Sequence, residues 1–164
     1  MYNLSYWSSW SNGFNIWKSE FDKIDKNLKL NKLFPHTSLF LTQHQAKLFC
    51  INDNLLFDVQ RIPKRGGHNK FEAFTIEYPS LLDECCKKGH ISTKCKKHIL
   101  FGIMVQFLPS LLFNKYIIRI ETFDDTGFRN NLKKYYPSYA YWLVLISVLG
   151  VPFRLFCRKL KNKR

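Results

Sequence analysis

Large apolar side chains recur at helical spacing near the N-terminus. They follow one another at steps of three and four residues, which places them on one face of a helix, while Ser, Asn, Lys, Glu and Asp occupy the opposite face. The pattern predicts an amphipathic helix within residues 1–33. Because such rings suit both a protein core and a bilayer interface, this face either packs on the domain or a partner, or lies on lipid. The predicted interface residues are Trp7, Trp10, Phe14, Trp17 and Phe21.

Short runs of aromatic and β-branched residues follow, separated by turn-forming residues. Such runs are typical of strands, and Asn52 to Asn54 suits a tight hairpin between two of them. A further turn is expected at Asp124 to Gly127. We therefore expect a small antiparallel sheet within an α+β fold. The expected strands are 37–43, 47–51, 55–62, 70–78 and 116–123.

Two central helices are expected beside this sheet. Ser80 with Asp83 three residues later resembles a capping box and predicts a short helix up to Lys88, ended by Gly89. The apolar run 99–113 carries no charge, and as a helix it reaches only about 22 Å, which is short of a full membrane span. It is a core helix, a re-entrant segment or the first arm of a membrane hairpin.

The longest apolar run, YYPSYAYWLVLISVLGVPFRLFC, covers residues 135–157. As a helix it would extend about 34 Å, enough to cross a hydrocarbon core of about 30 Å. Tyrosines and a tryptophan crowd its first part and basic residues close its end, a pattern that favours a transmembrane helix. The alternative is a buried core helix, because the strictly apolar centre is short. The expected membrane-anchor residues are Tyr139, Trp142, Leu145, Leu149, Phe153 and Arg154.

The net charge of +14 is concentrated near the C-terminus, since residues 129–164 carry nine Lys or Arg and no Asp or Glu. Because this basic region surrounds the apolar run, it favours a membrane flank over a phosphate-binding surface. We expect four parts: an aromatic N-terminal helix (1–33), an α+β domain (34–134), a transmembrane anchor (135–157) and a basic tail (158–164). The tail residues are Arg158, Lys159, Lys161, Lys163 and Arg164.

The N-terminus does not resemble a signal peptide, because its first basic residue is Lys18 and it contains no long apolar run. A single span at 135–157 would send the rest of the chain across the bilayer without an export signal. A second span at 99–113, or a tail anchor inserted after synthesis, would leave the body of the chain in the cytosol. We therefore expect an intracellular membrane protein with a cytosolic body.

The stretch DECCKKGHISTKCKKH, residues 83–98, gathers possible metal ligands. Cys85, His90 and Cys95 have the spacing of the last three ligands of a zinc knuckle, and His98 could supply a fourth. The Cys-x2-Cys that opens such a knuckle is absent, and Leu82 stands in its place. Zinc is therefore one hypothesis, beside reduced structural thiols and a disulfide or redox role, and no other cofactor is expected.

Motifs of common catalytic sites are absent from the sequence, among them Gly-x-Ser-x-Gly, His-Glu-x-x-His and a phosphate-binding glycine loop. We therefore expect a non-enzymatic, membrane-anchored accessory subunit or adaptor. Its partners would be a lipid bilayer and a protein that docks on the aromatic helix. The alternative is a soluble, basic nucleic-acid-binding protein, in which residues 64–67, the lysines of 87–97 and the tail contact phosphates.

Overall fold

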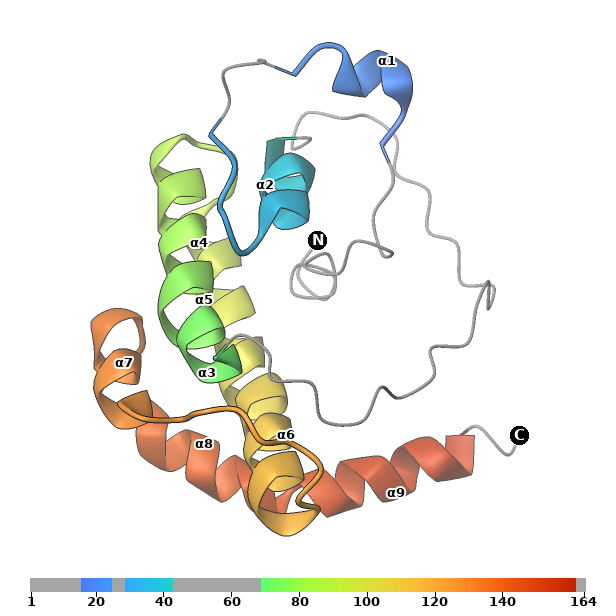
Figure 1. Ribbon diagram of the computed structural model, residues 1–164, viewed down its shortest axis with the longest axis vertical. Helices are drawn as coiled ribbons and strands as arrows, with labels where there is room; N and C mark the ends of the chain where they lie inside the picture. Colours follow the sequence, from blue (N-terminus) through green and yellow to red (C-terminus); the bar gives the residue numbers. More distant parts are fainter. Residues whose placement is uncertain (1–15, 25–28, 43–68, 162–164) are drawn as a thin grey trace.

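The computed structural model describes residues 16–24, 29–42 and 69–161, and every regular element within these ranges is helical (Figure 1). Two long helical runs lie side by side at the centre, and shorter helices pack around them. In chain order the elements are α1 (Lys18–Phe21), α2 (Pro35–Thr42), α3 (Lys70–Glu72), the π-helical η3 (Ala73–Glu77), α4 (Tyr78–Lys87), α5 (Thr93–Gly102), the π-helical η4 (Ile103–Phe107), α6 (Leu108–Leu112), the π-helical η5 (Phe113–Ile117), α7 (Phe128–Tyr135), α8 (Ala140–Leu149) and α9 (Val151–Lys161).

The two long runs form an antiparallel hairpin. The first continues through α3, η3 and α4, and the second through α5, η4, α6 and η5. Gly89 allows the tight turn between them, because its φ of +74° lies in the left-handed region that residues with a Cβ rarely adopt. Ser92 then caps the second run, and its hydroxyl accepts a hydrogen bond from the Cys95 N–H at 3.1 Å. The predicted end of the first central helix at Gly89 is confirmed, although α4 begins earlier than expected.

The same four residues, Pro-Ser-Leu-Leu, occur in both long runs, at 79–82 and at 109–112. In each run a five-residue π-helical stretch ends two residues before the proline. Proline has no N–H, so carbonyl groups of the preceding turn lose their backbone donor, and the local hydrogen-bond pattern must change. The repeated motif therefore creates the same backbone defect twice, once in each half of the hairpin.

Side chains from the C-terminal third supply donors at both defects. The Tyr136 hydroxyl donates to the Phe74 carbonyl at 2.8 Å, and the Arg154 Nη1 donates to the Val105 carbonyl at 2.9 Å. Burial raises the pKa of the Tyr136 phenol, so this group remains a protonated donor at neutral pH. These two bonds attach the C-terminal helices to the hairpin, because an unpaired carbonyl is costly inside a protein.

The core is built largely from aromatic rings. Phe34, just before α2, meets the rings of Phe74 and Tyr78 edge to face, with centroids 5.3 Å and 5.0 Å apart. Lower in the hairpin, Phe71 packs against Phe123 and Phe128, which brings the segment before α7 onto the first run. This packing joins α2, the hairpin and α7 into one hydrophobic core.

The predicted sheet is wrong, because the described residues contain no strand. The range 37–42 lies in α2, 70–78 lies in the first long run, and 116–123 continues from η5 into irregular backbone. The segments 47–51 and 55–62 fall outside the described residues. The error at 70–78 has a simple cause: Phe71, Phe74 and Tyr78 are buried at steps of three and four, so the helical period outweighed the β preference of these residues.

The apolar run 99–113 forms part of a helix that packs in the core. This agrees with the first of the three interpretations given above. This second long run reaches from Thr93 to Ile117 and buries most of its large aliphatic side chains against the first run and α8. The expected turn at Asp124 to Gly127 is also confirmed, since the Asp124 carboxylate accepts a hydrogen bond from the Thr126 N–H at 2.9 Å and Gly127 has a φ of +75°.

Candidate functional site

The segment expected to form one transmembrane helix, 135–157, is divided in the structure. It begins with the last residue of α7, turns at Ser138 and Tyr139, continues as α8, and bends by 48° before α9. Two residues explain the bend: Gly150 ends α8, and Pro152 cannot donate a backbone hydrogen bond to the last turn of α8. In Figure 1 the two helices run across the lower end of the hairpin, with α8 on one side of α6 and α9 on the other.

The fully buried side chains of α8 and α9 are small and the most exposed ones are large, while Tyr141, Leu143 and Leu145 are partly buried against the core. Ala140, Val144 and Val151 are buried, and α8 packs on η4 and α6. The opposite face carries large apolar side chains that are 57% to 81% exposed, at steps of three and four residues across the bend. We call this face the apolar stripe; it consists of Tyr139, Trp142, Ile146, Leu149, Phe153 and Phe156. Contiguous exposed apolar surface of this kind marks a contact with another molecule or with lipid.

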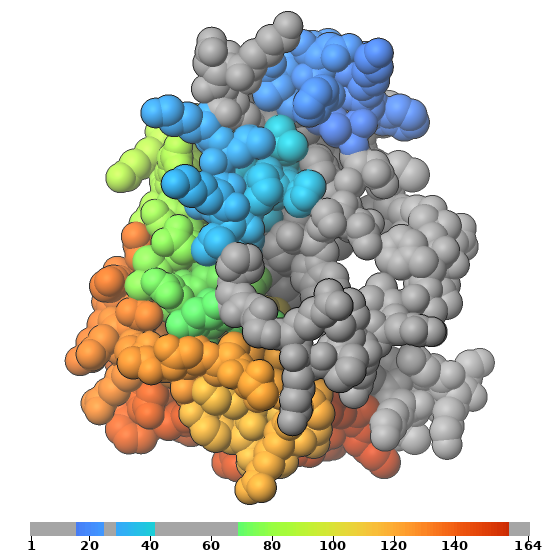
Figure 2. Space-filling model, viewed as in Figure 1, coloured from blue at the N-terminus to red at the C-terminus, as the bar shows by residue number. Residues whose placement is uncertain are grey.

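Four of the six residues expected in the anchor belong to this stripe. The other two lie elsewhere: Leu145 is half-buried beside a groove, and Arg154 turns back to the Val105 carbonyl. Sequence reasoning missed Ile146 and Phe156, although the alternation of steps of three and four that identified the N-terminal stripe would have found both. In Figure 2 atoms of α8 reach the surface at the lower end of the molecule.

A shallow apolar groove of about 370 Å³ runs between α8 and the end of the second long run. Leu149 lines both the groove and the apolar stripe. The Asp125 carboxylate stands at its edge, where it pairs with the Lys115 ammonium at 2.6 Å and accepts a hydrogen bond from the Tyr116 hydroxyl. Burial raises the pKa of Asp125, but these two partners outweigh it and hold the pKa below its usual range. The same hydrogen bond raises the pKa of Tyr116 to about 12.

Among the described residues, one straight helix is long and apolar enough to cross a bilayer, the run Thr93–Ile117. Half of its most apolar part is buried in the fold, and a core helix meets the same criteria of length and composition. The pair α8 and α9 meets them only if the two bent helices are counted as one broken span. The exposed stripe, rather than helix length, therefore distinguishes the C-terminal helices.

The possible metal ligands lie around the turn between α4 and α5. Cys85 and Cys95 are buried, His90 is half-buried and His98 is exposed on the next helix. Burial raises the pKa of the Cys85 thiol to about 11, so in the metal-free protein this group is a protonated thiol at neutral pH. In the part of the chain that the structure describes, no three His, Cys, Asp or Glu side chains gather as metal ligands.

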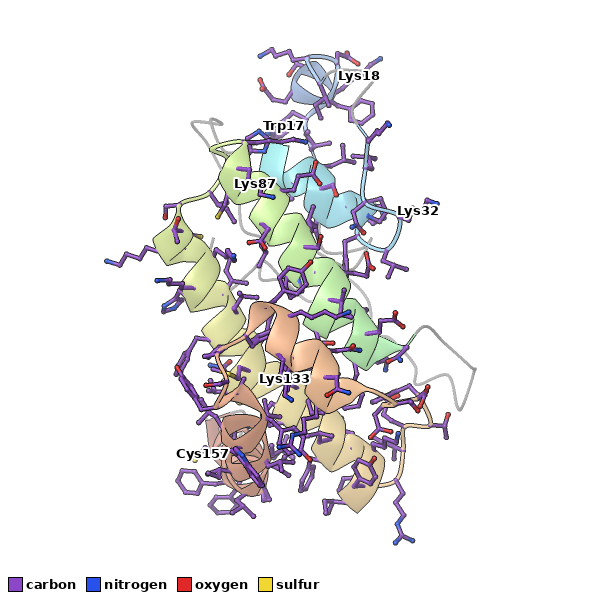
Figure 3. All side chains as sticks on the ribbon, turned by 90° about the vertical axis from the view of Figure 1, so that its left-hand side faces the viewer. Trp17, Lys18, Lys32, Lys87, Lys133 and Cys157 are labelled. Atoms are coloured by element: carbon purple, nitrogen blue, oxygen red, sulfur yellow. The ribbon has the colours of Figure 1, made fainter. Side chains whose placement is uncertain are left out.

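The lysines of this turn lie at the end of the molecule opposite α8 and α9, as the labels of Lys87 and Cys157 show in Figure 3. Two of them are partly neutralised, because Lys88 pairs with Glu84 at 2.6 Å and Lys96 pairs with Asp83. Nucleic-acid binding by these lysines stays a prediction, because no feature of the described residues tests it.

The predicted interface helix is described only in part. Trp17 and Phe21 are exposed at α1, while Trp7, Trp10 and Phe14 lie outside the described residues. The basic tail begins within α9, and Lys163 and Arg164 also lie outside the described range. Comparison of the chain with protein-family models, with curated proteins and with solved structures gives no match. The geometry of the apolar stripe is thus the observation on which a functional proposal can rest.

Proposed function

We propose that this protein binds the surface of a lipid bilayer through the apolar stripe, with α8 and α9 lying in the plane of the membrane. The observation that carries the proposal is the exposed row of six large apolar side chains on these helices, whose fully buried positions hold only Ala and Val. A helix that folds only to fill a core would bury its largest apolar side chains. This arrangement leaves the most apolar surface available for lipid.

Transfer of the apolar stripe from water to lipid lowers the free energy by a moderate amount. Each of the six side chains of the stripe has more than half of its surface exposed to water. Moving that surface into an apolar phase is favourable by on the order of 1 kcal/mol per side chain. The sum over the six side chains is comparable to the free energy with which a single acyl chain binds a membrane, which gives only marginal, reversible binding. Stable binding therefore needs a contribution from charge as well.

Charge supports a bilayer as the occupant. Residues 129–164, which contain the stripe, carry a net +9 without a single acidic residue. Anionic lipid surfaces attract such segments by about 1 kcal/mol for each nearby Lys or Arg. Tyr139 and Trp142 at one end of the stripe are amphipathic and suit the headgroup level. A protein partner would need an equally acidic surface around an apolar groove to match both properties.

In-plane binding fits the packing better than a full crossing. Ala140 and Val144 of α8 are buried against the hairpin, and Arg154 is bonded to the Val105 carbonyl. A crossing would have to separate these contacts and expose the apolar face of α6. On this arrangement the lysine-bearing turn between α4 and α5 points away from the membrane. The protein would act as a non-enzymatic accessory subunit or adaptor that presents this end to a partner on an intracellular membrane.

Vesicle sedimentation tests the proposal. The purified protein is mixed with phosphatidylcholine vesicles that contain phosphatidylglycerol, and the bound fraction is measured against lipid concentration. Leu149→Glu should weaken binding at least tenfold, because it places a charge where the stripe meets lipid. The control Phe101→Glu replaces an apolar side chain that is 51% exposed on α5 and does not belong to the stripe, and it should change binding less than twofold.

Equal loss in the two variants, or no binding by the unaltered protein, would contradict the proposal. Carbonate extraction of membranes from expressing cells distinguishes the two modes of attachment. Release of the protein supports in-plane binding, and retention in the membrane pellet shows a crossing helix instead and overturns the in-plane arrangement.

A further inference from the structure

A small polar hollow lies where α7 meets the start of α8. Arg129 and Lys133 approach it from α7, Ser138 lies in the turn, and Tyr141 and Trp142 close it from α8. The volume of the hollow is about 40 Å³. Figure 3 labels Lys133, one of the residues that line it. The hollow is next to the apolar stripe, because Trp142 belongs to both.

The two cations of the hollow are not neutralised within the described residues. Lys70, Lys96 and Lys115 each pair with a carboxylate, whereas no described carboxylate pairs with Arg129 or Lys133. The Arg129 guanidinium lies over the Tyr141 ring, 5.3 Å from its centroid, so the ring holds the cation in place without cancelling its charge. An anion in this hollow would therefore meet two positive charges and few competing groups.

We propose that this hollow binds the phosphate group of an anionic phospholipid headgroup, an inference that rests on the proposed membrane binding. A guanidinium can donate two parallel hydrogen bonds to phosphate oxygens, the Lys133 ammonium adds a second positive charge, and the Ser138 hydroxyl is a further donor at the rim. The Trp142 indole marks the depth at which headgroups lie beside the stripe. The donors of the hollow therefore suit a phosphate group, and the hollow lies at the depth where lipid phosphates lie.

The neighbouring groove supports a lipid rather than a free anion. Tyr141 lines the polar hollow on one side and the apolar groove on the other. A phospholipid has the same sequence of surfaces, a charged phosphate followed by apolar chains. The hollow is shallow, and Arg129, Lys133 and Ser138 are all exposed, so it would hold a free phosphate weakly in water. The bilayer supplies the missing affinity, because the stripe positions the headgroup at the site.

The test compares two double variants that remove the same charge. Arg129→Gln with Lys133→Gln empties the hollow of cations, and Lys94→Gln with Lys97→Gln removes two exposed lysines near the start of α5, beside its turn with α4. Binding is measured to vesicles of phosphatidylcholine alone and to vesicles with phosphatidylglycerol. The first variant should reduce the preference for anionic vesicles about tenfold, with binding to neutral vesicles unchanged. The second should reduce it less than threefold.

A closer control is Lys134→Gln against Lys133→Gln, because Lys134 is exposed on the same helix and does not line the hollow. A larger loss for Lys133→Gln supports the site. Equal losses within either pair of variants would show that only the net charge matters and would overturn the inference. Tight binding of inorganic phosphate alone, lost in the Arg129 and Lys133 double variant, would also overturn it in favour of a free-anion site.

The vesicle measurements distinguish an error in the proposed phosphate site from an error in the proposed role of the apolar stripe. If Leu149→Glu abolishes binding to both kinds of vesicle while the two double variants behave alike, only the phosphate site is wrong. If Leu149→Glu has no effect but Arg129 and Lys133 control the anionic preference, the apolar stripe is wrong and the hollow stands. Thermal unfolding of each variant confirms that these exposed substitutions leave the fold intact.

Discussion

Two apolar helical regions of this chain are used in opposite ways. In the second long run, Thr93–Ile117, large side chains such as Ile99, Ile103 and Leu108 are buried. Its exposed large apolar side chains are Phe101, Tyr116 and Ile117. In α8 and α9 the buried positions are Ala and Val, and the exposed positions are Trp, Ile, Leu and Phe. Both regions are apolar in composition, yet only the first behaves as an ordinary core helix.

The comparison shows that apolar composition does not identify which side of a helix faces the core. The decisive quantity is which face carries the large side chains once the helix is packed. For α8 the fully buried positions that face the hairpin hold Ala140 and Val144, Leu143 and Leu145 are partly buried beside them, and the side chains of the stripe are left outside. A surface arranged in this way is the basis of the proposed membrane contact.

The largest expected difference is between the same substitution in the two regions. Leu108→Ala removes a side chain that is fully buried, and it should lower the free energy of unfolding by about 2–5 kcal/mol. Leu149→Ala removes a side chain that is 81% exposed, and it should change stability by less than about 0.5 kcal/mol. Urea unfolding followed by circular dichroism measures both. A large loss for Leu149→Ala would show that the stripe is covered by the chain itself.

A smaller effect is expected at the attachment between the two regions. Tyr136→Phe removes the hydroxyl that donates to the Phe74 carbonyl and leaves this acceptor buried, at a cost of about 1–3 kcal/mol. The matched control is Tyr135→Phe, since the Tyr135 hydroxyl makes no hydrogen bond to another described residue, and it should cost less than about 0.5 kcal/mol. Thermal unfolding of the two variants tests the difference. Similar midpoints would mean that the Tyr136 bond contributes little.

The smallest effect concerns the segment that connects the regions, where Asp125 pairs with Lys115 and Tyr116. The pKa of Asp125 is lower in the folded state than in the unfolded chain, so its contribution to stability is complete above the unfolded pKa and is lost as pH falls through the folded pKa. Asp125→Asn should therefore destabilise the protein by about 1 kcal/mol at pH 7 and by progressively less below about pH 4. Unfolding midpoints measured across this range check it. A difference that stays constant down to pH 2 would contradict the ion pair's role.

Local signals predicted some elements well. Gly89 ends a helix as expected, and the residues Asp124 to Gly127 form the expected turn, because in both places one residue's own conformational preference decides the backbone. The run 99–113 is a core helix, one of the interpretations offered. The predicted strand at 70–78 is wrong, because Phe71, Phe74 and Tyr78 have helical spacing and are buried on one face of a helix. The repeated Pro-Ser-Leu-Leu is the sequence signal that segments 70–82 and 100–112 are alike.

The sequence by itself determined what depends on neighbouring residues: the turns, the apolar composition of the C-terminal run and its acid-free charge. Only the tertiary structure decided which face of α8 is buried, that Arg154 caps a carbonyl of the hairpin, and that Arg129 and Lys133 share a hollow with Trp142. The physical reason is that burial and pairing are relations between residues far apart in the chain. Composition and spacing describe one helix, whereas packing against other helices selects the side of that helix that remains exposed.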